Sequence, residues 1–182
     1  MEALIVDDIL EDFVRGKVKS VRAASIIPRV KKVIVAARKA RIPVVYVCDA
    51  HLESDPEISV WGEHAMKGTK GAQVVRELKP EKGDHVLEKR VYSSFHETGL
   101  DLLLREMGVN TVTIVGLYTE ICVRHSAADA FYRGYKIKIP TDCVEAFTEK
   151  DQIEGLDYLR NMYGAKLLTS EELIKQWRSR RS

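Results

Sequence analysis

Short apolar runs alternate along the chain with longer stretches in which apolar residues recur at helical spacing. Six strands are predicted by the continuous or β-branched runs at residues 3–7, 43–48, 85–88, 111–117, 135–140 and 165–168. Helices are predicted at residues 26–40, 72–78, 98–107, 120–132 and 150–163, with a last helix that begins at Ser170. Because strands and helices alternate, we expect an α/β protein: a three-layer α/β/α fold around a six-stranded, mostly parallel sheet.

The length suits one domain. The chain has 182 residues, of which 45% are hydrophobic and 31% charged, and this profile is typical of a globular protein. No repeat, low-complexity tract or linker divides it, so we expect residues 1–182 to form a single domain. Residues 49–71 contain Asp, Pro and three glycines and predict a long loop, a feature that is often functional in a compact domain.

The net charge and the length of the apolar runs indicate which classes of partner we do not expect. Lys and Arg number 29 against 27 Asp and Glu, a net charge of +2, which predicts no nucleic-acid binding. No apolar run approaches the roughly eighteen residues of a membrane helix, and acidic residues interrupt the start before a signal-peptide core could form. We therefore expect a cytoplasmic protein with no membrane partner. A solvated tail is predicted by four cations in the last eight residues: Lys175, Arg178, Arg180 and Arg181.

Reactive side chains follow the ends of several predicted strands. Asp8 follows the first strand, Lys89 the third and Cys122 the fourth. Carboxyl ends of parallel strands meet at one sheet edge, so these residues predict a cysteine nucleophile with an acid/base partner. If Thr119 caps the next helix, Cys122 lies in its first turn, where the helix N-terminus lowers the thiol pKa. On position alone, a buried core cysteine is an equal alternative, and it is the favoured interpretation of Cys48 and Cys143.

A second group of polar residues lies in the long loop. Asp49 and His51 stand two residues apart at a strand end, where side chains alternate and both point the same way. With Glu57 and His64 they form a donor set that suits Zn²⁺, Fe²⁺ or Mn²⁺, and a solvated polar loop is the alternative. His85, His96 and His125 have no partner pattern and are interpreted as structural. The rings of Phe13 and Trp61 suit either the core or the stacking of a substrate.

Several segments, in order along the chain, resemble motifs of the isochorismatase-like cysteine hydrolase superfamily, which includes nicotinamidases. They are residues 3–13, 89–95 and 116–122, with residues 61–64 and 68–72 as a further match. The resemblance implies a six-stranded parallel sheet between helices and a catalytic triad of Asp8, Lys89 and Cys122. It also implies a cis peptide between Leu117 and Tyr118, and an oxyanion hole formed by the N–H groups of Tyr118 and Cys122.

The resemblance also implies an activity. Cys122 would attack an amide carbonyl while Asp8 handles the proton, ammonia would leave, and water would cleave the thioester. In nicotinamidases a divalent metal orients the pyridine nitrogen of the substrate. The resemblance gives a metal set of Asp49, His51, Glu57 and His64, and a substrate set of Phe13, Trp61, Leu117 and Tyr118.

Two departures from the family pattern bear on the site. Asp7 stands where the family usually has an apolar residue, and Tyr118 replaces a usually small one, which would narrow or reshape the pocket. The leading hypothesis is a nicotinamidase-like amidase that cleaves the C–N bond of a small-molecule carboxamide. The alternatives are an N-carbamoyl amide hydrolase, a metal-independent isochorismatase-type hydrolase, and a non-enzymatic binding module on the same fold. From the family we expect a homo-oligomer, either a dimer or a tetramer.

Overall fold

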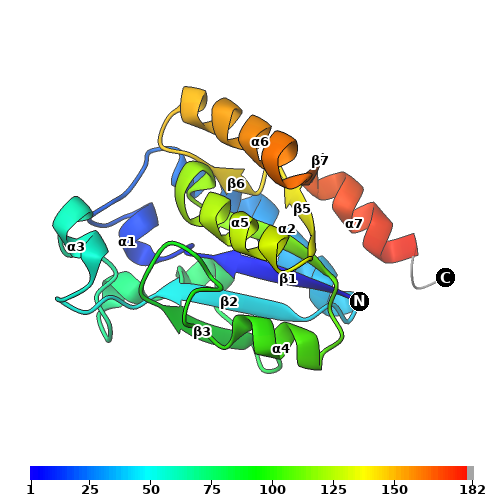
Figure 1. The fold of residues 1–182 in the computed structure, drawn as a ribbon, viewed down its shortest axis with the longest axis horizontal. Helices are drawn as coiled ribbons and strands as arrows, with labels where there is room; N and C mark the ends of the chain where they lie inside the picture. The colour runs from blue at the N-terminus through cyan, green and yellow to red at the C-terminus, as the bar shows by residue number, and fades with distance from the viewer. Residues whose placement is uncertain (180–182) are drawn as a thin grey trace.

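A parallel sheet forms the centre of the molecule in a computed structural model that describes residues 1–179 (Figure 1). The strand order is β3-β2-β1-β4-β5-β7, with the short β6 paired to β4, and every pair is parallel. The strands are β1 (Glu2–Asp7), β2 (Val44–Asp49), β3 (His85–Lys89), β4 (Thr111–Leu117), β5 (Lys136–Pro140), β6 (Val144–Glu145) and β7 (Lys166–Leu168). The chain builds outward from β1 to β3 and then crosses to β4, so the strand order reverses between β1 and β4.

Helices cover both faces of this sheet (Figure 1). They are α1 (Glu11–Val14), α2 (Ile27–Lys39), α3 (Pro56–Trp61), α4 (Leu100–Glu106), α5 (Arg124–Tyr132), α6 (Glu149–Tyr163) and α7 (Ser170–Ser179). Alternate residues of β1 point to opposite faces: Leu4 and Val6 pack with α2 and α7, whereas Ala3 and Ile5 pack with α4, α5 and α6. None of the helices in residues 1–179 has the length and apolar character needed to cross a membrane.

The predicted α/β/α fold is confirmed, and the local differences have physical reasons. The additional strand, β6, has only two residues, too few for a pattern to reveal. The segment predicted as a loop contains α3, which begins with Pro56 at its first position, where the missing N–H does no harm. Instead of one helix over residues 72–78, the chain forms two 3₁₀ turns, η2 (Lys70–Ala72) and η3 (Arg76–Leu78). A further 3₁₀ turn, η1 (Ala23–Ile26), precedes α2.

The C-terminal helix is part of the packed structure. Thr169 and Glu172 form a capping box, in which Thr169 Oγ1 accepts the N–H of Glu172 at 3.2 Å and Glu172 Oε2 accepts the N–H of Thr169 at 2.7 Å. Trp177 is buried, and its indole N–H donates to Glu2 at 3.0 Å. Of the four cations predicted to form a solvated tail, Lys175 and Arg178 lie exposed on α7. Arg180 and Arg181 lie outside the described residues.

Candidate active site

The structure brings the three predicted reactive residues together at the carboxyl edge of the sheet. Lys89 Nζ lies 2.6 Å from Asp8 Oδ2 and 2.5 Å from Asp49 Oδ1, and all three side chains are buried. The Cys122 sulfur and carboxylate oxygens of Asp8 and Asp49 lie within 4.8 Å of one another. A buried ammonium is thus held between two carboxylates, with a thiol beside them. The pairing of Lys89 with Asp49 was not predicted from the sequence.

Strand pairing places the acid of this cluster. Asp8 directly follows β1, and its Oδ1 accepts the backbone N–H of Asp49, at the end of β2, at 2.8 Å. Asp8 has a φ of 51°, in the left-handed region that Asp tolerates better than most residues. On the other side, Gly116 of β4 pairs with Asp7, and a Cβ at Gly116 would lie 1.8 Å from the Asp7 carbonyl oxygen. The backbones of β1 and β4 therefore approach closely beside the cluster.

Cys122 lies in a π-helical turn, η4 (Thr119–Val123), ahead of α5. The prediction that Thr119 caps an α-helix with Cys122 in its first turn is therefore wrong. The peptide between Leu117 and Tyr118 is cis, as the resemblance implied. The expected lowering of the thiol pKa also fails, because burial raises the pKa of Cys122 well above its usual value and the nearby carboxylates add to this, although Lys89 opposes it.

The charges in the cluster favour proton transfer through Asp8. Burial and the neighbouring Asp49 raise the pKa of Asp8 well above its usual value. Burial alone would lower the pKa of Lys89, but Asp49 and Asp8 outweigh it and raise that pKa, so the amine remains an ammonium. A carboxylate whose pKa is raised is a stronger base than an ordinary carboxylate, so Asp8 can accept a proton and later return it, which is the requirement for acid/base catalysis.

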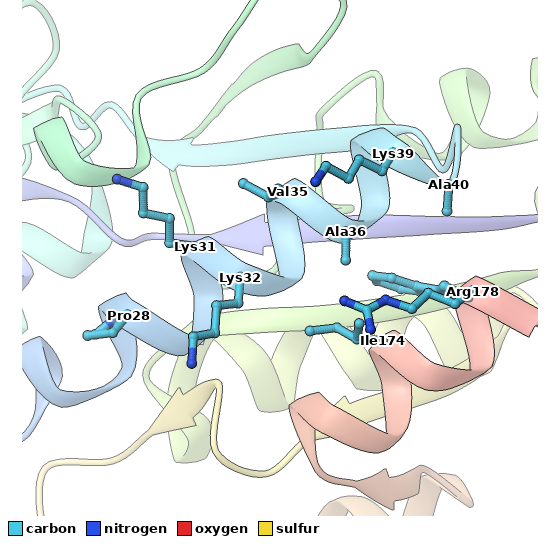
Figure 2. Close-up of a pocket in the computed structure, with 10 residues that line it drawn as sticks. Pro28, Lys31, Lys32, Val35, Ala36, Lys39, Ala40, Ile174 and Arg178 are labelled. Atoms are coloured by element: carbon cyan, nitrogen blue, oxygen red, sulfur yellow. The ribbon is translucent and has the colours of Figure 1, made fainter.

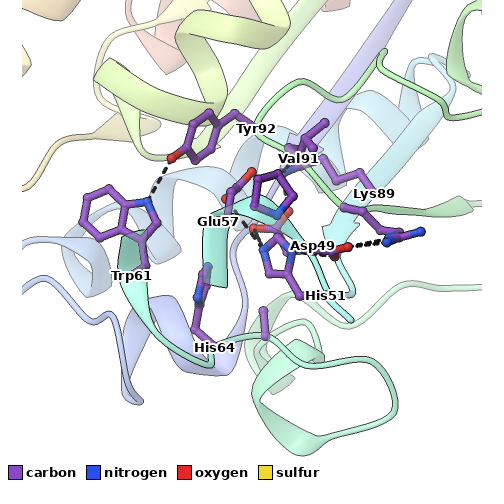
Figure 3. Close-up of polar contacts among 12 residues, drawn as sticks. Asp49, His51, Glu57, Trp61, His64, Lys89, Val91 and Tyr92 are labelled. Carbon is purple, nitrogen blue, oxygen red and sulfur yellow. Dashed lines mark hydrogen bonds and ion pairs between the residues drawn. The ribbon is translucent and has the colours of Figure 1, made fainter. Parts of the chain in front are cut away.

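The second predicted group also converges (Figure 3). One ligand-type atom from each of Asp49, His51, Glu57 and His64 lies within 4.8 Å of the others, and all four residues are buried. Among the described residues, Asp49 Oδ2, His51 Nε2 and Glu57 Oε1 are buried atoms with no hydrogen-bond partner. His51 Nε2 lies 3.4 Å from Asp49 Oδ2 and 3.7 Å from Glu57 Oε2, so imidazole and carboxylate atoms face one another across this space. Two buried carboxylates and two imidazoles at such distances form a donor set that fits a divalent metal.

Further contacts orient the two histidines for such a role. His51 Nδ1 lies 3.2 Å from Asp55 Oδ2, and His64 Nδ1 lies 2.7 Å from the Gly62 carbonyl oxygen, which leaves the Nε2 atoms for a cation. Asp55 is itself held by Arg90, whose Nε donates to Asp55 Oδ1 at 2.8 Å. This hydrogen bond and others lower the pKa of Asp55 to about 2. Sequence reasoning missed Asp55, although its position four residues after His51 was a usable signal.

Beside the thiol lies a small cavity with aromatic walls. Three of the four predicted substrate residues line it: Phe13 of α1, Trp61 of α3 and Tyr118. The fourth, Leu117, is buried in the core and is not among the lining residues. Cys122 and three residues of the metal-type group also face this cavity, so the nucleophile and the possible cation site open into one space. Sequence reasoning missed two of its aromatic residues, Tyr92 and Phe147.

The other cysteines and the other hollows lack this combination of groups. Cys48 and Cys143 are buried, and burial raises the pKa of each thiol, in agreement with their interpretation as core residues.

A larger cavity of about 740 Å³ lies between α2 and α7 (Figure 2). It is lined by apolar side chains together with Lys31, Lys32, Lys39 and Arg178. No cysteine, histidine or carboxylate is among its lining residues, so it lacks the combination of thiol and acid found beside Cys122.

Comparisons with known proteins show the family to which the chain belongs. The family model for the isochorismatase domain matches residues 2–172, so the chain belongs to the isochorismatase family. N-carbamoylsarcosine amidase from Thermoplasma acidophilum is 43% identical, with a TM-score of 0.89 over 93% of this chain and 96% of that one. A nicotinamidase from Bacillus subtilis is 30% identical, with a TM-score of 0.87 over 91% and 98% of the two chains.

A metal-bound relative is also similar. Pyrazinamidase of Pyrococcus horikoshii, solved in complex with zinc, is 29% identical, with a TM-score of 0.87 over 92% of this chain and 98% of that one. Together these relatives confirm the predicted family and the predicted class of enzyme, a hydrolase. The dimer or tetramer expected from the family stays a prediction.

Proposed function

We propose that residues 1–182 form a single-domain cysteine amidase that hydrolyses a small, neutral carboxamide through a thioester on Cys122. One observation carries the proposal: a Lys89 ammonium 2.6 Å from Asp8 and 2.5 Å from Asp49, with the Cys122 sulfur within 4.8 Å of carboxylate oxygens of both. Solved relatives named as amidases support a hydrolase that acts on C–N bonds.

In the acylation half of the proposed reaction, Asp8 takes the proton from the Cys122 thiol as sulfur attacks the amide carbonyl carbon. The carbonyl oxygen becomes an oxyanion, which we assign to the backbone N–H groups of Tyr118 and Cys122. Asp8 then gives its proton to the amide nitrogen, the C–N bond breaks and ammonia leaves. Lys89 stays protonated throughout and limits the charge that builds up between Asp8 and the thiolate.

In the deacylation half, the thioester carbonyl carbon is attacked by water, and Asp8 accepts the water proton. The C–S bond then breaks, the carboxylic acid leaves, and Asp8 returns its proton to Cys122. Each half uses the same base and the same oxyanion donors, so a single cluster serves both. The raised pKa of the buried thiol supports this sequence, because the sulfur is neutral until Asp8 takes its proton.

Asp49, His51, Glu57 and His64 are the residues that would hold a divalent metal, which we propose to be zinc, iron or manganese. When bound, the metal would supply a Lewis-acid contact for a ring nitrogen of the substrate and so orient the carboxamide. Because Asp49 also contacts Lys89, it links this site to the catalytic cluster.

The lining of the cavity supports a neutral, flat substrate. Its residues are mainly aromatic or aliphatic, and its ionisable groups are Asp49, Glu57, His64, Tyr92, Tyr118 and Cys122. No lysine or arginine is among these lining residues, so no Lys or Arg side chain of the lining would neutralise a substrate carboxylate. Aromatic rings favour planar heteroaromatic amides such as nicotinamide.

One observation favours a second candidate. The 43% identity to N-carbamoylsarcosine amidase supports hydrolysis of an N-carbamoyl amino acid, in which the carbamoyl C–N bond is cleaved. That substrate carries a carboxylate, and a metal bound at the donor set would be the positive charge available to it in this pocket. The two candidates therefore differ in substrate charge.

The test is ammonia release from nicotinamide and from N-carbamoylsarcosine by protein loaded with zinc, iron or manganese. We expect faster release from nicotinamide. Cys122→Ala should abolish turnover, and rapid acid quench should trap an acyl adduct on Cys122 that mass spectrometry detects. Cys143→Ala removes another buried cysteine and is the matched control. Turnover that survives Cys122→Ala would refute the mechanism, and release from N-carbamoylsarcosine alone would replace the first substrate with the second.

A further inference from the structure

The cavity beside Cys122 is too small for the substrate that its chemistry suits. Its volume is about 20 Å³, enough for roughly one water molecule. Ligand pockets for drug-sized molecules occupy roughly 300–1,000 Å³. A planar carboxamide can therefore reach the sulfur only if a lining side chain changes its position.

A row of three aromatic rings lines the cavity. Phe147 stands in the middle: its ring centroid lies 4.0 Å from that of Tyr118, at an interplanar angle of 27°, and 5.9 Å from that of Trp61, at 14°. Phe147 lies on the segment between β6 and α6, whereas Trp61 ends α3 and Tyr118 follows β4. Three separate parts of the chain thus meet over the nucleophile.

The two outer rings are held by hydrogen bonds. The Tyr118 hydroxyl is 2.8 Å from the backbone carbonyl oxygens of Phe13 and of Val18, and its ring is almost fully buried. The Trp61 indole N–H donates to the Tyr92 hydroxyl at 3.0 Å (Figure 3). Movement of either ring would break a hydrogen bond, and for Tyr118 the broken bond is buried.

Phe147 is held differently. Its hydrocarbon ring has no polar atom to anchor it, and the residue is partly exposed. Its backbone N–H donates to Glu120 Oε1 at 3.1 Å, which fixes the main chain beside the turn that carries Cys122. The ring can therefore turn toward solvent about its side-chain bonds while the backbone stays in place.

We propose that Phe147 is a specificity-determining residue that sets the largest amide able to reach Cys122. This inference rests on the proposed amidase function. A small planar amide enters when the Phe147 ring turns aside and packs against the substrate face. A fused bicyclic amide requires more space than that rotation opens. Tyr118 forms the fixed wall of the pocket and Phe147 the adjustable one.

The test compares kcat/KM for nicotinamide with kcat/KM for quinoline-3-carboxamide. Phe147→Ala should raise the bicyclic-to-monocyclic ratio about tenfold or more, and Phe147→Trp should lower it. Phe131→Ala removes a half-exposed phenylalanine on α5 and is the matched control, which should leave the ratio unchanged. A ratio that is the same in wild type, Phe147→Ala and Phe147→Trp would overturn the proposal.

Alkylation of Cys122 gives a readout that does not depend on amidase activity. Rates with iodoacetamide and with the bulkier N-phenylmaleimide are measured by peptide mass mapping in each variant. Phe147→Ala should accelerate the bulky reagent at least about tenfold relative to the small one, and Phe147→Trp should have the opposite effect. If no amide is hydrolysed but these ratios shift, the proposed function fails and the role of Phe147 in access stands. If amides are hydrolysed and no ratio shifts, the role of Phe147 fails alone.

Discussion

Replacement of Asp7 by asparagine should change how the stability of the fold depends on pH. Asp7 is buried at the end of the central strand β1, where Ser126 Oγ donates to its Oδ2 at 2.8 Å. Its Oδ1 has no hydrogen-bond partner among the described residues. Burial raises the pKa of Asp7 to about 6, even though Lys89 opposes the shift. Between about pH 4 and pH 6, Asp7 therefore keeps its proton in the folded protein, whereas an unfolded chain with a carboxyl pKa of about 3.9 has lost it.

The magnitude follows from these two pKa values. A carboxyl pKa of about 6 in the folded state, against about 3.9 in the unfolded state, corresponds to about 3 kcal/mol. Because the folded-state pKa is the higher one, Asp7 is favourable below pH 4. Its contribution to the free energy of unfolding falls as the pH rises from about 4 to 6 and stays lost above that. Asparagine has no such titration.

The assay is urea unfolding of wild type and Asp7→Asn at intervals from pH 4 to 7. The free energy of unfolding of wild type minus that of the variant should fall by about 2 kcal/mol across this range, because the unfolded-state carboxyl is already about half ionised at pH 4. Asp157→Asn, which removes an aspartate on α6 whose side chain is 53% exposed, is the matched control for the loss of a carboxyl group. A wild-type-minus-Asp7→Asn difference that stays constant with pH would refute the assignment of a buried, protonated carboxyl group.

Three further substitutions test other parts of the site. Asp55→Asn weakens the partner that orients His51, so zinc affinity measured by calorimetry should fall about 10- to 100-fold. Unchanged affinity would remove Asp55 from the proposed metal site. Gly116→Ala places a Cβ against the Asp7 carbonyl oxygen and should lower the free energy of unfolding by about 3 kcal/mol or more in urea. A variant as stable as wild type would contradict the close approach of β1 and β4. Tyr118→Phe removes the one O–H donor that lies 2.8 Å from the carbonyl oxygens of Phe13 and Val18, at a cost of about 1–3 kcal/mol by the same assay. A neutral effect would mean that water replaces the hydroxyl.

The fold class could be predicted because strand and helix patterns alternate along almost the whole chain. Such an alternation indicates a parallel sheet covered by helices, whichever individual boundaries are misplaced. The position of Asp8, Lys89 and Cys122 at one sheet edge needed only the rule that carboxyl ends of parallel strands meet. The π-helical turn at Cys122 could not be predicted, because apolar spacing over five residues does not separate a π turn from an α turn. The prediction of a lowered pKa for the Cys122 thiol was wrong for a related reason. Burial in the folded cluster raises that pKa, and it outweighs any effect of the local helix.

Other features of the site depend on contacts between distant segments. Phe147 reaches Trp61 across 86 positions of sequence, and no local period marks that pairing. Arg90 secures Asp55 in the same way, through a contact that only the folded loop creates. Asp7 was recognised as a departure from the family pattern, but its burial could not be predicted. The burial arises because helices pack on both faces of β1, and the identity of one residue does not indicate that packing.

The four ligand-type residues lie close together in the sequence: Asp49 ends β2, and His51, Glu57 and His64 follow it in the loop that connects β2 to β3. The nucleophile lies beyond β4, on the far side of the central strand. Three of these residues, His51, Glu57 and His64, thus belong to a loop that supplies neither the thiol nor Asp8, whereas Asp49, at the end of β2, belongs to both groups through its contact with Lys89. Changes confined to that loop could therefore give a descendant a different set of cation ligands while Asp8, Asp49, Lys89 and Cys122 kept their places.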